Sequence, residues 1–126
     1  MRNFLIDTDT ASDDAVAIIM ALADPDVRVL GLTTVAGNVG LDQATSNALL
    51  TAEICNSAVP VFMGAEKPLT RAHEHAHWFH GKDGLGDRGY PSPKGKPERD
   101  ESPEQTALPT NRSAKPNTIS SKGTTS

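Results

Sequence analysis

Residues 3–15 read NFLIDTDTASDDA: a short apolar run, then four aspartates within eight positions, then the beginning of a helical pattern. The apolar run over residues 3–7 ends at a polar cluster, as a buried parallel strand does. Ser12 is a suitable N-cap, and apolar residues recur beyond it at helical spacing until Pro25 ends the pattern. This stretch therefore predicts a strand, a turn and a helix.

The alternation of strand and helix continues along the chain. Residues 27–35, rich in Val, Leu and Thr, predict a second strand, and residues 59–63 predict a third. Between them, Asp42 can cap a second helix that ends near Asn56. The order βαβαβ with short connections predicts a Rossmann-like α/β fold, in which helices flank a parallel sheet. Right-handed crossovers place the carboxyl ends of all strands on one edge of that sheet. Asp9 and Asn38 follow the first two strands, so we expect them to converge at this edge, where ligands bind in open α/β sheets.

Composition limits the classes of function. The chain has 126 residues, enough for one domain at most. Its net charge of −4 argues against a nucleic-acid partner, because binding phosphates requires a basic surface. The single cysteine, Cys55, cannot form an internal disulfide, and no secretion signal or long apolar run is present. We therefore expect a cytoplasmic protein with no membrane segment.

The end of the chain differs in composition from the rest. Residues 91–126 contain six of the nine prolines and are rich in Ser and Thr, with few large apolar residues. A segment of this kind cannot bury enough apolar surface to offset the entropy lost on ordering. We expect residues 1–97 to form the folded part and residues 98–126 to be a disordered tail.

The four aspartates of the opening stretch are the candidates for chemistry. Asp7, Asp9, Asp13 and Asp14 surround one strand-to-helix turn, where their mutual repulsion is costly unless a cation lies among them. Carboxylate oxygens without a nearby thiolate suit Ca²⁺ or Mg²⁺ better than Zn²⁺. The alternative is that two of the four only complement the helix dipole and the other two are solvated.

Three short stretches together resemble the nucleoside hydrolases, the inosine-uridine preferring ribohydrolases. IDTDTASDDA at residues 6–15 resembles the family's N-terminal aspartate motif. TVAGN at residues 34–38 resembles its second strand and ribose-binding asparagine, and HGKDGLG at residues 80–86 resembles its histidine-glycine loop. The resemblance covers about residues 3–97 and corresponds to the N-terminal part of a family whose members are more than twice this length.

The resemblance implies a role for each matched residue. Asp9 would be a calcium ligand and the general base, and Asp14 would be a second calcium ligand. Asp13 and Asn38 would hold the ribose hydroxyls, and His80 would lie near the base. The implied reaction, part of nucleoside salvage, is calcium-dependent hydrolysis of a small-molecule ribonucleoside to ribose and free base. Complete relatives would be homo-oligomers.

The resemblance is incomplete in two ways. Thr10-Ala11 stands where the family commonly has Pro-Gly, and the later segments that complete the family's site have no counterpart. The sequence therefore predicts a truncated domain. Within it, we expect Asp7 to support the aspartate cluster from behind. Two other interpretations stay open: an inactive fragment or metal-binding module, and a haloacid-dehalogenase-like phosphohydrolase with Asp7 as nucleophile and Asp9 as acid/base.

The histidine-rich stretch allows two readings. His73, His75, His77 and His80 are spaced like a zinc tract, but no cysteine or second cluster completes a tetrahedral set, so a partly exposed loop is favoured. Trp78 and Phe79 either pack this loop against the domain or border a nucleobase. Cys55 is interpreted as a core residue.

Overall fold

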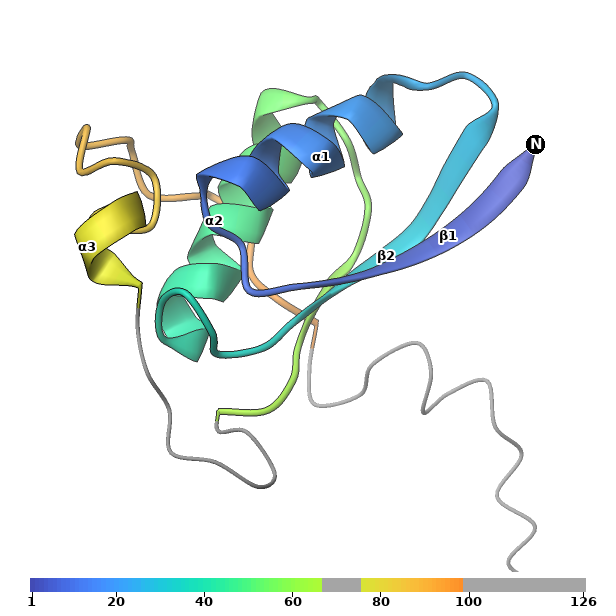
Figure 1. Ribbon diagram of the computed structural model, residues 1–126. Coiled ribbons are helices and arrows are strands. Elements are labelled where there is room, and N and C mark those ends of the chain that lie inside the picture. Colours follow the sequence, from blue (N-terminus) through green and yellow to red (C-terminus); the bar gives the residue numbers. More distant parts are fainter. Residues whose placement is uncertain (67–75, 99–126) are drawn as a thin grey trace, which may run out of the picture.

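The computed structural model describes residues 1–66 and 76–98, and Figure 1 shows their arrangement. Its strands form one parallel sheet in the order β1-β2-β3. The strands are β1 (Arg2–Thr8), β2 (Val27–Thr34) and β3 (Val61–Met63). The predicted parallel α/β architecture is confirmed, and the ends of β1 and β2 lie within one residue of the predicted ends.

The two long helices cover the same face of the sheet (Figure 1). They are α1 (Ser12–Ala23) and α2 (Leu41–Ile54), and a short α3 (His77–His80) follows later in the chain. Each long helix connects neighbouring strands, and both connections step across the sheet in the same direction. Right-handed crossovers in one direction place their helices on one face. Because β1 and β2 are parallel neighbours, the turns that follow them lie at the same edge of the sheet.

Both predicted helix caps are wrong by one or two residues. Ala11, not Ser12, is the N-cap of α1, and Gly40, not Asp42, is the N-cap of α2. Neither helix has a side-chain hydrogen bond at its cap. The hydroxyl of Ser12 is instead hydrogen-bonded to Nδ1 of His80, at 3.1 Å, which explains why it does not cap the helix.

The core lies between the sheet and the two long helices. Ile18 of α1, Leu32 of β2, Ala48 of α2 and Val61 of β3 are buried together, and Ile6 packs against them. Burial of each large aliphatic side chain contributes about 1.5–3 kcal/mol. Residues 2–4 and Asp7 of β1 are exposed, Leu5 and Ile6 are partly buried, and in this strand Thr8 alone is fully buried. The prediction of a buried first strand is therefore wrong for most of its length.

The third strand is shorter than predicted. It begins at Val61 because Pro60 has no N–H to donate, although the Pro60 carbonyl still accepts a hydrogen bond from Leu32 N at 2.9 Å. On the outer edge of β3, Glu98 N donates to Val61 O at 2.7 Å. Glu98, which the sequence placed in the tail, therefore pairs with the sheet.

Some predictions concern residues outside the described ranges. The rest of the expected tail, residues 99–126, falls there, as do His73 and His75 of the histidine-rich stretch. Within the described ranges, none of the helices is both long and apolar enough to cross a lipid bilayer. Cys55 is the C-cap of α2 and is only partly buried, so it lies at the border of the core.

Candidate active site

The loop after β1 is held by threonine hydroxyls. Thr8 is buried, and its Oγ1 accepts a hydrogen bond from Thr10 N at 3.1 Å. The same oxygen lies 3.2 Å from Oγ1 of Thr10. It also donates to Oδ2 of Asp14 at 3.0 Å. This turn therefore holds the start of α1 against the end of β1 and keeps the intervening aspartate, Asp9, at the edge of the sheet.

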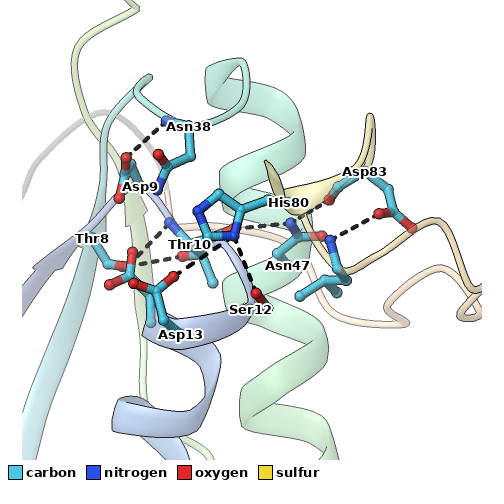
Figure 2. A network of polar contacts seen from close by, with 11 residues as sticks. Thr8, Asp9, Thr10, Ser12, Asp13, Asn38, Asn47, His80 and Asp83 are labelled. Carbon is cyan, nitrogen blue, oxygen red and sulfur yellow. Dashed lines mark hydrogen bonds and ion pairs between the residues drawn. The ribbon is translucent and has the colours of Figure 1, made fainter. Parts of the chain in front are cut away.

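The turn after β2 holds the Asp9 carboxylate in place. Its Oδ2 accepts a hydrogen bond from Asn38 N at 2.8 Å (Figure 2). A Cβ atom at position 37 would collide with the Asp9 carboxylate, so Gly37 is what permits the two turns to approach so closely. Asp9 and Asn38 are thus joined across two strands, as their positions at neighbouring strand ends predicted.

Asp14 occupies the most unfavourable electrostatic position in the cluster. Burial of its carboxyl, its hydrogen bond with Asp9 and the negative charges of Asp9 and Asp13 raise its pKa from 3.8 to about 6. The hydrogen bond from Thr8 acts in the opposite direction but is outweighed. A cation beside Asp9 and Asp14 would reverse this balance, because it would favour both carboxylates in their charged form.

His80 comes from a distant part of the sequence and lies against the start of α1 (Figure 2). Its ring is 9% exposed, and Nδ1 lies 3.1 Å from Oγ of Ser12 and 3.9 Å from Oδ1 of Asp13. Asp13 itself is 73% exposed, so its carboxylate faces solvent at the border of the site. The structure therefore brings His80 together with Ser12 and Asp13 at the start of α1.

The segment that carries His80 is a loop stabilised by its own carboxylates. Oδ1 of Asp83 accepts hydrogen bonds from Leu85 N and Asp87 N, and Oδ1 of Asp87 accepts from Lys82 N and Asp83 N. Several glycines of this segment have positive φ, which only glycine adopts without strain. We call residues 80–87 the histidine loop, and residues 8–11 the aspartate loop.

The sequence did not identify two residues that shape this site. Gly37 makes room for Asp9, and Asn47 of α2 is buried with hydrogen bonds to both loops. Gly37 could have been noticed as a glycine two residues after the end of a predicted strand. Asn47 gave a weaker signal: a polar residue within the helix segment whose other inward residues are mostly apolar.

Asp7 lies outside the cluster, contrary to prediction. It is exposed, and its Oδ1 accepts a hydrogen bond from Oγ1 of Thr33 on β2 at 2.6 Å. Side chains alternate along a strand, so Asp7 points to the opposite face of the sheet from Thr8. Asp7 therefore neither supports the cluster from behind nor faces it as a nucleophile would.

The donors present match a hard cation in type but not in number. Asp9 and Asp14 supply carboxylate oxygens, which suit Ca²⁺, and burial, followed by the neighbouring carboxylates, raises the pKa of Asp14. Within residues 1–66 and 76–98, no group of three or more His, Cys, Asp or Glu is arranged to hold a metal ion. Ca²⁺ takes about six to eight oxygen ligands, so two carboxylates alone would fill only a small part of such a site.

Comparison with known proteins identifies the family. The family model described as inosine-uridine preferring nucleoside hydrolase matches residues 4–124, almost the entire chain. The chain belongs to the nucleoside hydrolase family. The match extends beyond residue 97, where the stretch that carried the resemblance ended. Membership does not favour the phosphohydrolase interpretation, which the position of Asp7 also disfavours.

Individual nucleoside hydrolases support the assignment. A probable uridine nucleosidase 2 of Arabidopsis thaliana is 44% identical, over 82% of this chain and 33% of the relative. The inosine-uridine preferring nucleoside hydrolase of Leishmania major is 42% identical, over 71% of this chain and 29% of the relative. The structure of a purine-preferring ribonucleoside hydrolase from Gardnerella vaginalis superposes with a TM-score of 0.75 at 31% identity. The superposition covers 83% of this chain and 34% of that structure. The chain thus spans about a third of the length of these relatives.

Proposed function

We propose that this chain provides the catalytic aspartates of an enzyme that hydrolyses the N-glycosidic bond of ribonucleosides, giving ribose and free base. The observation that carries the proposal is the convergence of Asp9, Asp14, Asn38 and His80 at one edge of the sheet. These residues come from three separate turns, and they match the family's motifs in order. The expected cytoplasmic location, the role in nucleoside salvage and homo-oligomers for complete relatives belong to the same proposal.

Asp9 is suited to act as the general base. Its Oδ2 accepts the Asn38 N–H, which fixes the orientation of the carboxylate, and with Asp14 ionised the Asp9 carboxylate could accept a proton from the attacking water. Asp9 and Asp14 would hold Ca²⁺, which supplies a water of lowered pKa when bound. The negative charge of the cluster also favours an oxocarbenium-like ribose in the transition state.

The neighbouring polar groups would orient the substrate. Asp13 is exposed beside the cluster and can accept hydrogen bonds from ribose hydroxyls, as can the side chain of Asn38. His80 is held by Ser12 near Asp13, at a place from which it could face the base. The names of the relatives mention uridine, inosine and purines, so the substrate class proposed here is the ribonucleosides without a preferred base.

A chimera tests this function, because the chain spans only part of its relatives. Residues 3–98 would replace the homologous segment of the Leishmania major relative, and ribose release from uridine and inosine would be measured with Ca²⁺. We expect activity in the chimera, and Asp9→Asn should lower kcat by about 10²–10⁴, as loss of a general base does. Asp42→Asn, which removes an exposed aspartate in the first turn of α2, is the matched control and should leave kcat unchanged.

Three results would count against the proposal. Near-normal kcat in the Asp9→Asn chimera at saturating Ca²⁺ would remove Asp9 from the reaction. A requirement for inorganic phosphate, with ribose 1-phosphate as product, would indicate phosphorolysis instead of hydrolysis. A chimera that binds Ca²⁺ but never releases ribose would leave this chain as a metal-binding module.

A further inference from the structure

Asn47 has an unusual position for a polar side chain. It lies on α2, a helix that supplies none of the residues assigned to the reaction, and only 3% of its surface is exposed. Its Nδ2 donates to Thr10 O at 2.9 Å and to Asp83 O at 2.7 Å. Its Oδ1 accepts from Nε2 of Gln43, one helical turn earlier, at 2.9 Å. A buried side chain with this many hydrogen bonds is held in one orientation.

The two carbonyls that Asn47 binds belong to the two loops of the site. Thr10 follows Asp9 directly in the aspartate loop, and Asp83 lies three residues after His80 in the histidine loop. Figure 2 shows Asn47 between Thr10 and Asp83, with His80 beside it. Segments more than 70 residues apart in sequence are thus joined through a single amide group.

The histidine loop is shaped to fit against Asn47. Gly84 is buried, and a Cβ atom there would lie 3.1 Å from Nδ2 of Asn47 and 3.0 Å from Cγ1 of Val39. Both distances are shorter than ordinary van der Waals contact, so a side chain at position 84 would push the loop away from α2. Gly89 also has positive φ, at +70°, but its Cβ atom would meet nothing within 4 Å.

We propose that Asn47 is a positioning residue, which sets the distance between the aspartate loop and the histidine loop and thereby holds His80 against Ser12. The amide can do this because it presents two N–H donors to two carbonyls and still accepts from Gln43. Aspartate at this position would place an oxygen against both carbonyls, and alanine would leave both without their donor. The catalytic importance of this positioning rests on the proposed function. The bridge, meaning the two hydrogen bonds by which Asn47 joins Thr10 O and Asp83 O, does not depend on that function.

The test uses the complete chain without metal or nucleoside, so that its failure is separate from failure of the proposed function. The variants are Asn47→Ala and Asn47→Asp, with Thr45→Val as control. Thr45 is another buried polar residue of α2, and its hydroxyl bonds Leu41 O and Thr34, not the loops. Two quantities are measured in each folded variant: the ¹⁵N resonances of the His80 ring, and hydrogen exchange of the Gly86 amide, which donates to His80 O.

Loss of the bridge should be visible at His80. We expect Asn47→Ala and Asn47→Asp to shift the His80 Nδ1 resonance and to speed exchange at Gly86 at least tenfold. Thr45→Val should lower the free energy of unfolding, measured by urea titration, without moving the His80 resonance. An unchanged His80 resonance and Gly86 exchange rate in both folded Asn47 variants would overturn the proposal, as would an equal His80 shift in Thr45→Val.

A second pair of variants keeps the test decisive if both Asn47 variants fail to fold. Gly84→Ala places a methyl group against the Asn47 amide, whereas Gly89→Ala introduces the same substitution at a similar positive φ without that contact. We expect the His80 resonance to move in Gly84→Ala and to stay in place in Gly89→Ala. The same resonance position in Gly84→Ala as in the wild type would overturn the proposal.

Discussion

At the scale of single residues, the Asp9 carboxylate depends on the absence of a side chain at position 37. A Cβ atom there would meet not only the outer oxygen of Asp9 but also its Cβ, at 2.6 Å, and its Cγ, at 2.7 Å. Rotation of the Asp9 carboxylate alone therefore cannot relieve the clash. The turn after β2 and the turn after β1 can only coexist with glycine at this position.

Gly37→Ala should therefore destabilise the protein. Overpacking of this kind costs about 1–3 kcal/mol, because the two turns must separate. Gly40→Ala is the matched control, since a Cβ atom at Gly40 meets nothing within 4 Å, and it should change the free energy of unfolding by less than about 1 kcal/mol. Urea titration measures both, and equal stability of the two variants would show that the Asp9 turn is not tightly packed.

The raised pKa of Asp14 predicts a pH dependence of stability. Because the pKa is about 6 in the folded protein and near 3.8 when unfolded, the folded state binds the extra proton between these values. The contribution of Asp14 to the free energy of unfolding therefore falls as pH rises from about 4 to about 6, and is constant above that. Its size is of the order of 1 kcal/mol, because partial exposure screens the interaction.

Asp14→Asn isolates this contribution. The asparagine does not titrate, so the free energy of unfolding of the variant minus that of the wild type should increase between about pH 4 and pH 6 and then level off. Urea titrations at several pH values, without metal, measure the difference. A difference that is flat across this range, or that decreases, would contradict the account of the Asp14 environment.

Sequence reasoning worked for site residues that sit at strand ends and failed where contacts depend on packing. Asp9 and Asn38 were predicted to meet because parallel strands bring their carboxyl ends to one edge, and they do meet. Asp7 was placed in the cluster because it is near in sequence, but strand alternation turns it to Thr33. Asn47 could not be found in this way, since its partners depend on how the histidine loop docks against α2.

At the scale of elements, α1 shows how unevenly one helix contributes to stability. Ile18 is 1% exposed in the core, whereas Met20, two residues later, is 68% exposed on the outer side of the helix. The apolar period in the sequence located the helix, and its bounds match because Pro25 and the polar turn before Ser12 interrupt the pattern. The caps were not predictable, because the Ser12 hydroxyl bonds a residue 68 positions away.

Ile18→Ala and Met20→Ala should therefore differ strongly in stability. Removal of the Ile18 side chain leaves a cavity among Leu32, Ala48 and Val61, which costs about 2–5 kcal/mol. Met20→Ala should change the free energy of unfolding by no more than about 0.5 kcal/mol, because its side chain is already in water. Urea titration of both variants checks the core assignment, and similar losses in the two would refute it.

At the scale of the whole molecule, three parallel strands and two crossovers bring Asp9 and Asn38 together at one edge of the sheet. The chain spans about a third of its relatives. In the proposal, the described residues would supply only two carboxylate ligands to Ca²⁺, and within these residues no group of three or more His, Cys, Asp or Glu is arranged to hold a metal ion. A site with so few protein ligands should bind Ca²⁺ weakly, with Kd of about 10⁻⁴–10⁻³ M or above.

Calorimetric titration of Ca²⁺ into this chain tests directly whether the aspartate cluster binds calcium. Asp14→Asn removes a proposed ligand, and Asp42→Asn removes an equal charge from an exposed position on α2. We expect weak binding by the wild type, the same binding by Asp42→Asn, and loss of binding in Asp14→Asn. Identical heats from all three proteins would contradict this expectation.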